Sequence, residues 1–229
     1  MADERDATEP GVTGPGVTDG IGDGGPTRSV AAVVLAAGLG TRMGGGLAKP
    51  LVPFRGRPLV AHALDAAIAS GLVPVALVVG NDADTVAALA PSGVRVVLNA
   101  RYAEGIGTSL VAVLEAFAAD DDVTAVCVGL ADQPLVGPDA YRRLATAHCD
   151  GADLAVATYG GRRANPVLVG RSHWAEARTL AGDAGARVLL ARHPVVEVPC
   201  DGTGDPTDVD TPEDLSTLER ACGSRTTSG

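Results

Sequence analysis

Short apolar runs alternate with longer helical patterns along most of this chain. Four of the runs are rich in valine and apolar at consecutive positions: Val30–Leu35, Val73–Val79, Val94–Leu98 and Ala125–Leu130. Such runs are typical of parallel strands that are buried on both faces. Helical patterns follow the runs at residues 59–70, 82–90, 107–119 and 139–148. The alternation predicts an α/β fold, an open and mostly parallel sheet with helices on both faces, whose ligands bind beyond the carboxyl ends of the strands.

The second half of the chain is less regular. Residues 153–159 and 165–169 are strand-like and flank Gly160–Gly161, which predicts a hairpin. Two helical stretches (172–180 and 184–192), a short strand (195–198) and a final helix opened by Thr211-Pro212-Glu213-Asp214 follow. We expect a single domain over residues 29–221, a disordered Gly/Pro-rich acidic leader over 1–28 and a frayed tail over 222–229.

The composition excludes several classes of protein. The formal net charge of −10 leaves no basic surplus for a nucleic-acid backbone, so no nucleic-acid partner is expected. No apolar run is long enough for a membrane span, and the leader lacks the apolar core of a secretion signal. We therefore expect a cytoplasmic protein without a membrane partner. The cysteines form no CxxC pair, and the histidines have no metal-ligand spacing and are interpreted as ordinary helix or surface residues.

The loop after the first apolar run carries the only lysine, Lys49, among 18 basic residues. Its glycines let the backbone turn sharply, so that amide groups can face phosphate oxygens. Arg42 adds a planar guanidinium group and Lys49 a compact ammonium group. This combination is suited to binding a triphosphate and a pyrophosphate leaving group. Pro50 follows the lysine where a P-loop needs Ser or Thr, and Met43 stands where a dinucleotide fingerprint needs its third glycine. The loop is therefore a phosphate-binding loop of another kind.

The residues that match a known pattern are Leu35-Ala36-Ala37-Gly38, Arg42-Met43-Gly44, Lys49-Pro50-Leu51-Val52-Pro53 and Gly56-Arg57-Pro58-Leu59. They resemble the signature of the MobA-like nucleotidyltransferases, most closely the molybdenum cofactor cytidylyltransferase branch, and the resemblance extends over about residues 29–220. It implies a Rossmann-like fold of the nucleotide-diphospho-sugar transferase type. It also implies transfer of CMP from CTP, or of another nucleotide from its triphosphate, to the terminal phosphate of molybdenum-molybdopterin. Pyrophosphate would be released, and a molybdoenzyme would receive the product.

The same resemblance assigns roles to residues. Arg42, Lys49 and Asp132 are the expected catalytic residues, and Asp132, Asp210 and Asp208 are the expected ligands of Mg²⁺. Asp132 follows the fourth apolar run, where a carboxylate would face the ligand crevice. Asp208 and Asp210 are two apart in an extended segment and so share a face, although either could instead belong to the cap of the final helix.

Two sets of binding residues follow from the resemblance. The nucleotide set is Leu35, Ala36, Ala37, Gly38, Gly40, Arg42, Lys49, Asn81, Asn99 and Ser109, and the acceptor set is Asn165, Pro166, Asp183 and Arg187. Asn81 and Asn99 could instead be turn formers, and Asp183 could cap a helix. Ala164 departs from the glycine that is common before the Asn-Pro pair.

Two alternatives to cytidylyl transfer stay open. Guanylyl-transferring relatives usually carry a second glycine at the position of Ala37, whose β-carbon would crowd a purine. The other alternative is an NAD(P)H-dependent oxidoreductase of the nicotine blue oxidoreductase type on the same scaffold, because a scaffold does not fix chemistry.

Overall fold

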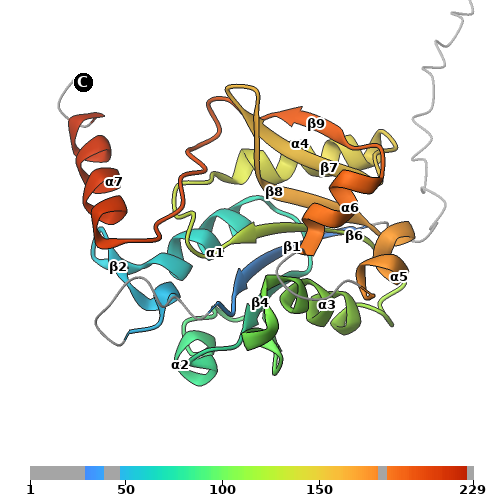
Figure 1. Ribbon diagram of the computed structural model, residues 1–229, viewed down its shortest axis with the longest axis horizontal. Coiled ribbons are helices and arrows are strands. Elements are labelled where there is room, and N and C mark those ends of the chain that lie inside the picture. Colours follow the sequence, from blue (N-terminus) through green and yellow to red (C-terminus); the bar gives the residue numbers. More distant parts are fainter. Residues whose placement is uncertain (1–28, 39–46, 180–184, 226–229) are drawn as a thin grey trace, which may run out of the picture.

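A computed structural model describes residues 29–38, 47–179 and 185–225, and within them a seven-stranded sheet is covered by helices on both faces (Figure 1). The strands lie in the order β5-β4-β1-β6-β8-β7-β9. Their bounds are β1 Ser29–Ala36, β4 Val75–Val79, β5 Val94–Leu98, β6 Val123–Leu130, β7 Leu154–Tyr159, β8 Arg162–Gly170 and β9 Val196–Pro199. The longer helices are α1 Leu59–Ala69, α3 Ile106–Ala116, α4 Pro138–Cys149, α6 Gly185–Arg192 and α7 Pro212–Arg225. Short elements complete the chain: η1 Lys49–Leu51, β2 Pro53–Phe54, β3 Arg57–Pro58, α2 Ala83–Ala87, η2 Tyr102–Glu104, η3 Arg171–His173 and α5 Trp174–Ala177.

The sheet is mostly parallel, which confirms the predicted fold class. The pairs β5·β4, β4·β1, β1·β6 and β7·β9 are parallel, whereas β8 runs antiparallel to both β6 and β7. The carboxyl ends of β1 and β6 therefore lie side by side at one edge, since Leu35 pairs with Leu130. The residues that follow these two strands, Gly38 and Asp132, meet at that edge for this reason.

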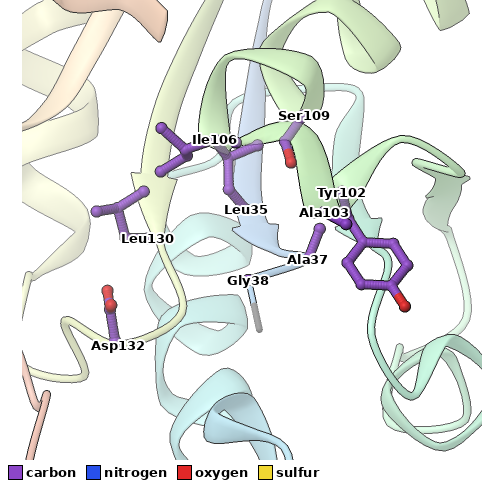
Figure 2. A pocket seen from close by; sticks show the side chains of 10 residues that line it. Leu35, Ala37, Gly38, Tyr102, Ala103, Ile106, Ser109, Leu130 and Asp132 are labelled. Atoms are coloured by element: carbon purple, nitrogen blue, oxygen red, sulfur yellow. The ribbon is translucent and has the colours of Figure 1, made fainter. Parts of the chain in front are cut away.

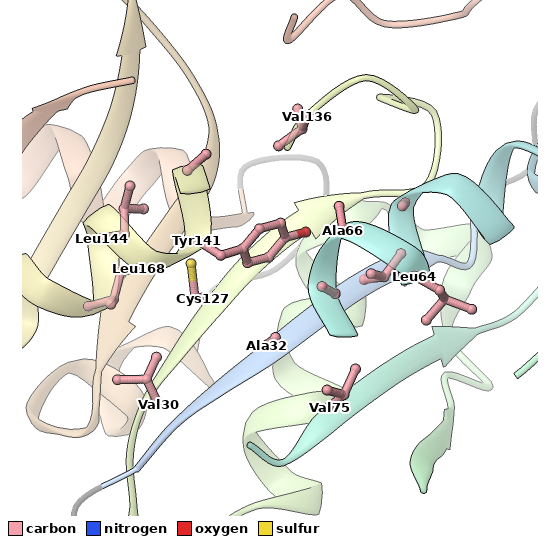
Figure 3. Packing of buried hydrophobic residues seen from close by; sticks show 14 of the residues in the cluster. Val30, Ala32, Leu64, Ala66, Val75, Cys127, Val136, Tyr141, Leu144 and Leu168 are labelled. Carbon is pink, nitrogen blue, oxygen red and sulfur yellow. The ribbon is translucent and has the colours of Figure 1, made fainter. Parts of the chain in front are cut away.

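The apolar runs divide their side chains between two cores. In β1, Val30, Ala32 and Val34 belong to a cluster with α1 and α4, whereas Ala31 and Val33 belong to a cluster with α3, α5 and α6. Figure 3 shows the first cluster, where Tyr141 of α4 lies beside Cys127 of β6. Because successive side chains of a strand point to opposite faces, a strand between two helical layers must be apolar at every position.

Three expectations from the sequence are wrong in detail. Residues 94–98 form β5, but β5 is an edge strand in which only Val97 is buried, so it is not covered on both faces. The helix expected over 82–90 is limited to α2, a single short stretch that ends at Ala87. The helix expected over 172–180 is the 3-10 turn η3 followed by the four residues of α5.

Two tight turns use backbone conformations that favour glycine. Gly160 and Gly161 join β7 to β8 with φ of 56° and 73°, which confirms the predicted hairpin as a turn with positive φ at both central residues. Arg55 and Gly56 make a similar turn between β2 and β3, with φ of 50° and 77°. Among the described residues, no helix is both long and apolar enough to cross a membrane.

Candidate functional site

A cavity of about 410 Å³ opens beyond the carboxyl ends of β1 and β6 and is bounded on one side by the start of α3 (Figure 2). Its lining consists of Leu35, Ala37, Gly38, Tyr102, Ala103, Gly105, Ile106, Ser109, Leu130 and Asp132. A smaller cavity of about 50 Å³ shares Asp132 with the large one and reaches Ala36, Lys49 and Pro50. The walls are mainly apolar, with Asp132 on one side and Ser109 and Tyr102 on the other, and a few polar groups in an apolar cavity are typical of small-molecule sites.

Lys49 connects two carboxylates that are far apart in the sequence. Its Nζ donates to Asp132 Oδ2 and to Asp210 Oδ1, both at 2.5 Å. The Lys49 side chain is 13% exposed, compared with 24% for Asp132 and 45% for Asp210. Burial alone would lower the pKa of Lys49, but the charges and hydrogen bonds of the two carboxylates outweigh burial and raise it. The ammonium therefore stays charged at neutral pH.

Asp210 reaches this place because an extended segment, residues 204–209, is hydrogen-bonded to the loop after β6. Val209 N donates to Asp132 O at 2.9 Å, and Asp205 N donates to Leu135 O at 3.0 Å. The side chain of Gln133 adds a third bond, from Nε2 to Pro206 O at 2.8 Å. Two backbone bonds and one side-chain bond thus hold the segment, and Asp210 directly after it, beside Asp132.

The helix cap, which was the alternative role for Asp208 and Asp210, belongs to other residues. Thr211 Oγ1 accepts the N–H of Asp214 at 3.2 Å, and the Asp214 carboxylate accepts the N–H of Thr211 at 2.8 Å. These reciprocal bonds form a capping box at the start of α7. The side chain of Asp210 instead faces Lys49.

The charges at this end of the cavity suit a divalent cation. Burial raises the pKa of Asp208, and the neighbouring charge of Asp132 raises it further, so three carboxylates lie close together with one ammonium. Asp132 Oδ1 is buried and has no hydrogen-bond partner among the described residues. An unpartnered buried carboxylate oxygen is costly unless a cation or donor arrives, and oxygen ligands are those that Mg²⁺ or Mn²⁺ prefers. The residues present therefore fit such an ion.

Asn99 is buried behind the cavity and is not part of its lining. Its Nδ2 donates to Thr108 Oγ1 at 2.9 Å and to Ser109 Oγ at 3.0 Å, and its Oδ1 accepts the N–H of Arg101 at 2.9 Å. Because the amide already donates to Ser109 Oγ, the hydroxyl proton of Ser109 can point into the cavity as a donor. In this geometry Asn99 orients Ser109 for any ligand.

Two of the four predicted acceptor residues line a separate cavity of about 290 Å³ between β7, β8 and α6. Asn165 and Arg187 belong to its lining, together with Arg163 and Leu190. Pro166 follows Asn165 at an irregularity of the β7·β8 register, where Ala157 pairs with Ala164 although Val156 pairs with Val167. The role of these residues stays a prediction.

Of the remaining predicted residues, three lie outside the described part of the chain and one lies outside the cavity lining. Gly40, Arg42 and Asp183 lie outside the described residues. Asn81 donates its backbone N–H to Ala37 O at 3.4 Å, and its side chain is not part of the cavity lining. Ala103 and Leu130 also line the cavity but were not among the predicted residues. Their side chains are apolar and have no reactive or charged group by which the sequence could mark them.

One family model matches most of the described chain, and several known proteins are similar in sequence. The MobA-like NTP transferase domain matches residues 32–198. The "Nicotine blue oxidoreductase" of Paenarthrobacter nicotinovorans is 35% identical over 202 residues, which are 82% of this chain and 96% of that protein. The "Bifunctional protein GlmU" of Agrobacterium fabrum is 40% identical over 131 residues, which are 56% of this chain but only 28% of that protein.

A solved structure is also similar along its whole length. The crystal structure of Rv0371C of Mycobacterium tuberculosis in complex with manganese superposes with a TM-score of 0.72 at 30% identity, over 85% of this chain and 100% of that one.

Proposed function

This chain belongs to the MobA-like NTP transferase domain family, and on that premise we propose that it transfers CMP from CTP to the terminal phosphate of a molybdenum-bearing pterin. Nucleotidyl transfer is the activity of the family, whereas the base and the acceptor are our proposal. The observation that carries it is the cavity beyond β1 and β6, at whose polar end Lys49 is held between Asp132 and Asp210.

Lys49 would act on the phosphates of the bound triphosphate. Its ammonium is charged and held 2.5 Å from two carboxylates, so phosphate oxygens can replace those carboxylates as its partners when CTP binds. The acceptor phosphate attacks the α-phosphorus in line, one P–O bond forms as the bond to the β-phosphate oxygen breaks, and pyrophosphate leaves. Lys49 would stabilise the negative charge that builds on that leaving group. A phosphate oxygen is already nucleophilic, so the reaction needs no Ser, Cys or His nucleophile.

Asp132, Asp208 and Asp210 would hold the divalent cation that the family uses. Such an ion, when bound, supplies positive charge beside the α-phosphate. The protein's own part is to present the unpartnered Asp132 Oδ1 and to keep the Asp210 carboxylate close to it through the 204–209 segment.

The base would lie against the apolar side of the cavity. Ser109 is the polar group there that Asn99 holds in place, and its hydroxyl can donate to a base carbonyl. Ala37 lies in the cavity wall. Its Cβ would be 2.9 Å from a Cβ added at Gly80, so Gly80 lies directly behind Ala37 and leaves it little space to move away from a ligand. We therefore assign preference for a pyrimidine to Ala37, and Ala37→Gly should raise activity with GTP relative to CTP.

The test is pyrophosphate release from CTP, GTP and ATP with molybdopterin and Mg²⁺. We expect CTP to give the fastest turnover, and we expect Lys49→Met and Asp132→Asn to lose most of it. Arg95→Met is the matched control, because it removes an exposed ion pair with Asp120 far from the cavity. Faster turnover with GTP would refute the base assignment, and undiminished release from both site variants would refute the site.

One observation favours a second candidate function. The relative that is 35% identical over most of both chains is named for reduction chemistry on a pigment rather than for nucleotidyl transfer. Under this alternative, the same cavity would bind a nicotinamide nucleotide. Loss of the nicotinamide absorbance band on addition of the pigment, without pyrophosphate release from any triphosphate, would favour the oxidoreductase.

A further inference from the structure

A second group of ligand-type side chains lies at the opposite end of the sheet from Lys49. His173 ends η3, Glu176 lies in α5, and His193 follows α6. Because η3 follows β8, which runs antiparallel to β6, these residues lie near the amino ends of the parallel strands. The group is therefore separate from the cavity beyond β1 and β6.

The three side chains converge on one point. One ligand atom from each lies within 4.8 Å of the others, and all three residues are partly buried. His193 Nε2 lies 2.6 Å from Glu176 Oε2, and the two imidazole rings have centroids 4.6 Å apart. Sequence spacing gives no hint of this, because only His173 and Glu176 are close in the chain, three residues apart on one helical face.

The geometry points to a zinc site: we propose that His173, Glu176 and His193 bind one Zn²⁺, with solvent as the fourth ligand. Two imidazoles and a carboxylate are a donor set that suits zinc, whereas the all-oxygen group around Asp132 suits Mg²⁺ or Mn²⁺. The two sites differ in ligand chemistry, and this inference does not depend on the proposed function.

Arg192 contacts only one of the two carboxylate oxygens of Glu176. Its Nη1 lies 3.3 Å from Glu176 Oε1, so Oε2 is the oxygen that faces His193. His193 Nε2 donates a proton to Glu176 Oε2 at 2.6 Å, and Zn²⁺ would replace that proton between the same two atoms. Partners of this kind orient ligands in known metal sites.

A zinc ion here would connect two parts of the chain. His173 and Glu176 precede residues 180–184 and His193 follows them, so the ion would link η3 and α5 to the carboxyl end of α6. The helix α6 also provides Arg187 and Leu190 to the 290 Å³ cavity. The ion would thus support a wall of that cavity without touching its ligand.

The experiment uses the full chain, stripped with a chelator and titrated with Zn²⁺ in excess Mg²⁺, which competes with zinc for the carboxylates around Asp132. Competition with a chromogenic chelator measures affinity and stoichiometry, and Co²⁺ in place of zinc reports geometry through its visible spectrum. We expect one Zn²⁺ per chain, an intense tetrahedral cobalt spectrum, and affinity reduced at least about ten-fold in His173→Ala, Glu176→Gln and His193→Ala. His62→Ala and Asp132→Asn should bind zinc as the wild type does.

The controls separate loss of ligands from loss of folding. Glu176→Gln keeps the shape of the side chain, and the urea unfolding midpoint without metal shows whether each variant is folded. Addition of Zn²⁺ should raise the midpoint of the wild type but not of His193→Ala. Equal zinc affinity in the wild type and all three variants would overturn the proposal, as would a cobalt–thiolate absorption band that places a cysteine in the site.

Discussion

Replacing Lys49 by methionine removes the ammonium between Asp132 and Asp210 but keeps an unbranched apolar side chain. The bridge is largely shielded on the lysine and Asp132 sides and half open on the Asp210 side. A fully buried pair that loses one partner costs about 3–5 kcal/mol, and an exposed pair about 0–1 kcal/mol. The Lys49 bridge lies between these limits, so we expect the variant to lose about 2 kcal/mol of unfolding free energy. For a chain of this size that lowers Tm by about 4–8 °C.

The assay is thermal and urea unfolding in the presence of a chelator, with Arg57→Met as a matched control. Arg57 makes one ion pair, with Asp65, and both side chains are more than half exposed, so its loss should leave Tm unchanged. The raised pKa of Lys49 fixes the pH dependence: the stabilisation is complete below the ordinary value of 10.5 and is lost as pH rises through the higher folded value. The difference between wild type and variant should therefore be constant around neutral pH.

Divalent cations give the decisive comparison for the same variant. Without the ammonium, Asp132 and Asp210 repel each other, so Mn²⁺ should raise the Tm of Lys49→Met more than that of the wild type. The reasoning is refuted if Lys49→Met is as stable as the wild type in chelator, or if Mn²⁺ stabilises both proteins equally.

Three further predictions concern other parts of the molecule. Gly80→Ala places a Cβ 2.6 Å from Tyr102 Cβ, so we expect Tyr102 to shift, KM for the nucleotide to rise and stability to fall by about 1–3 kcal/mol, as steady-state kinetics and urea unfolding will show. Burial raises the pKa of the Cys127 thiol, whereas Cys149 is exposed, so alkylation of the native protein followed by peptide mapping should label Cys149 and spare Cys127. Burial raises the pKa of Tyr159 from 10.0 to about 12, so the stability that its neutral form contributes is present below pH 10 and should be lost between those values in alkaline unfolding experiments.

The fold could be predicted because most strands bury both faces. In β1 every residue after Ser29 is buried, and an unbroken apolar run is the direct trace of such a strand in the sequence. The same reasoning fails for β5, because Val96 and Leu98 are apolar but 41% and 64% exposed. An apolar pattern records which side chains can be buried, and it does not record whether a neighbouring strand or helix is present to bury them.

The sequence could predict residues of the candidate site, but not which of those residues contact one another. Asp132 follows a buried strand and could be placed at the ligand edge of the sheet by that fact alone. From the sequence, Lys49 is expected to bind phosphate groups and Asp210 a metal ion, whereas the structure places the two side chains in contact with each other. That contact depends on the bonds between residues 204–209 and the loop after β6, and two of these join backbone atoms, which the residue types of the sequence do not reveal.

The distance along the chain between Lys49 and Asp210, 161 residues, has a consequence for how the protein is made. During synthesis the seven strands all emerge before Asp210 does, because β9 ends at Pro199. The two helical layers can therefore pack before Asp210 is available to contact Lys49. Segment 204–209 and helix α7 complete the site last, and they add Val209 and Leu218 respectively to a small third core with Phe54. A nascent chain that stopped after β9 would contain every strand of the sheet but lack Asp210, so the contact between Lys49 and Asp210 forms only after the whole sheet has been synthesised.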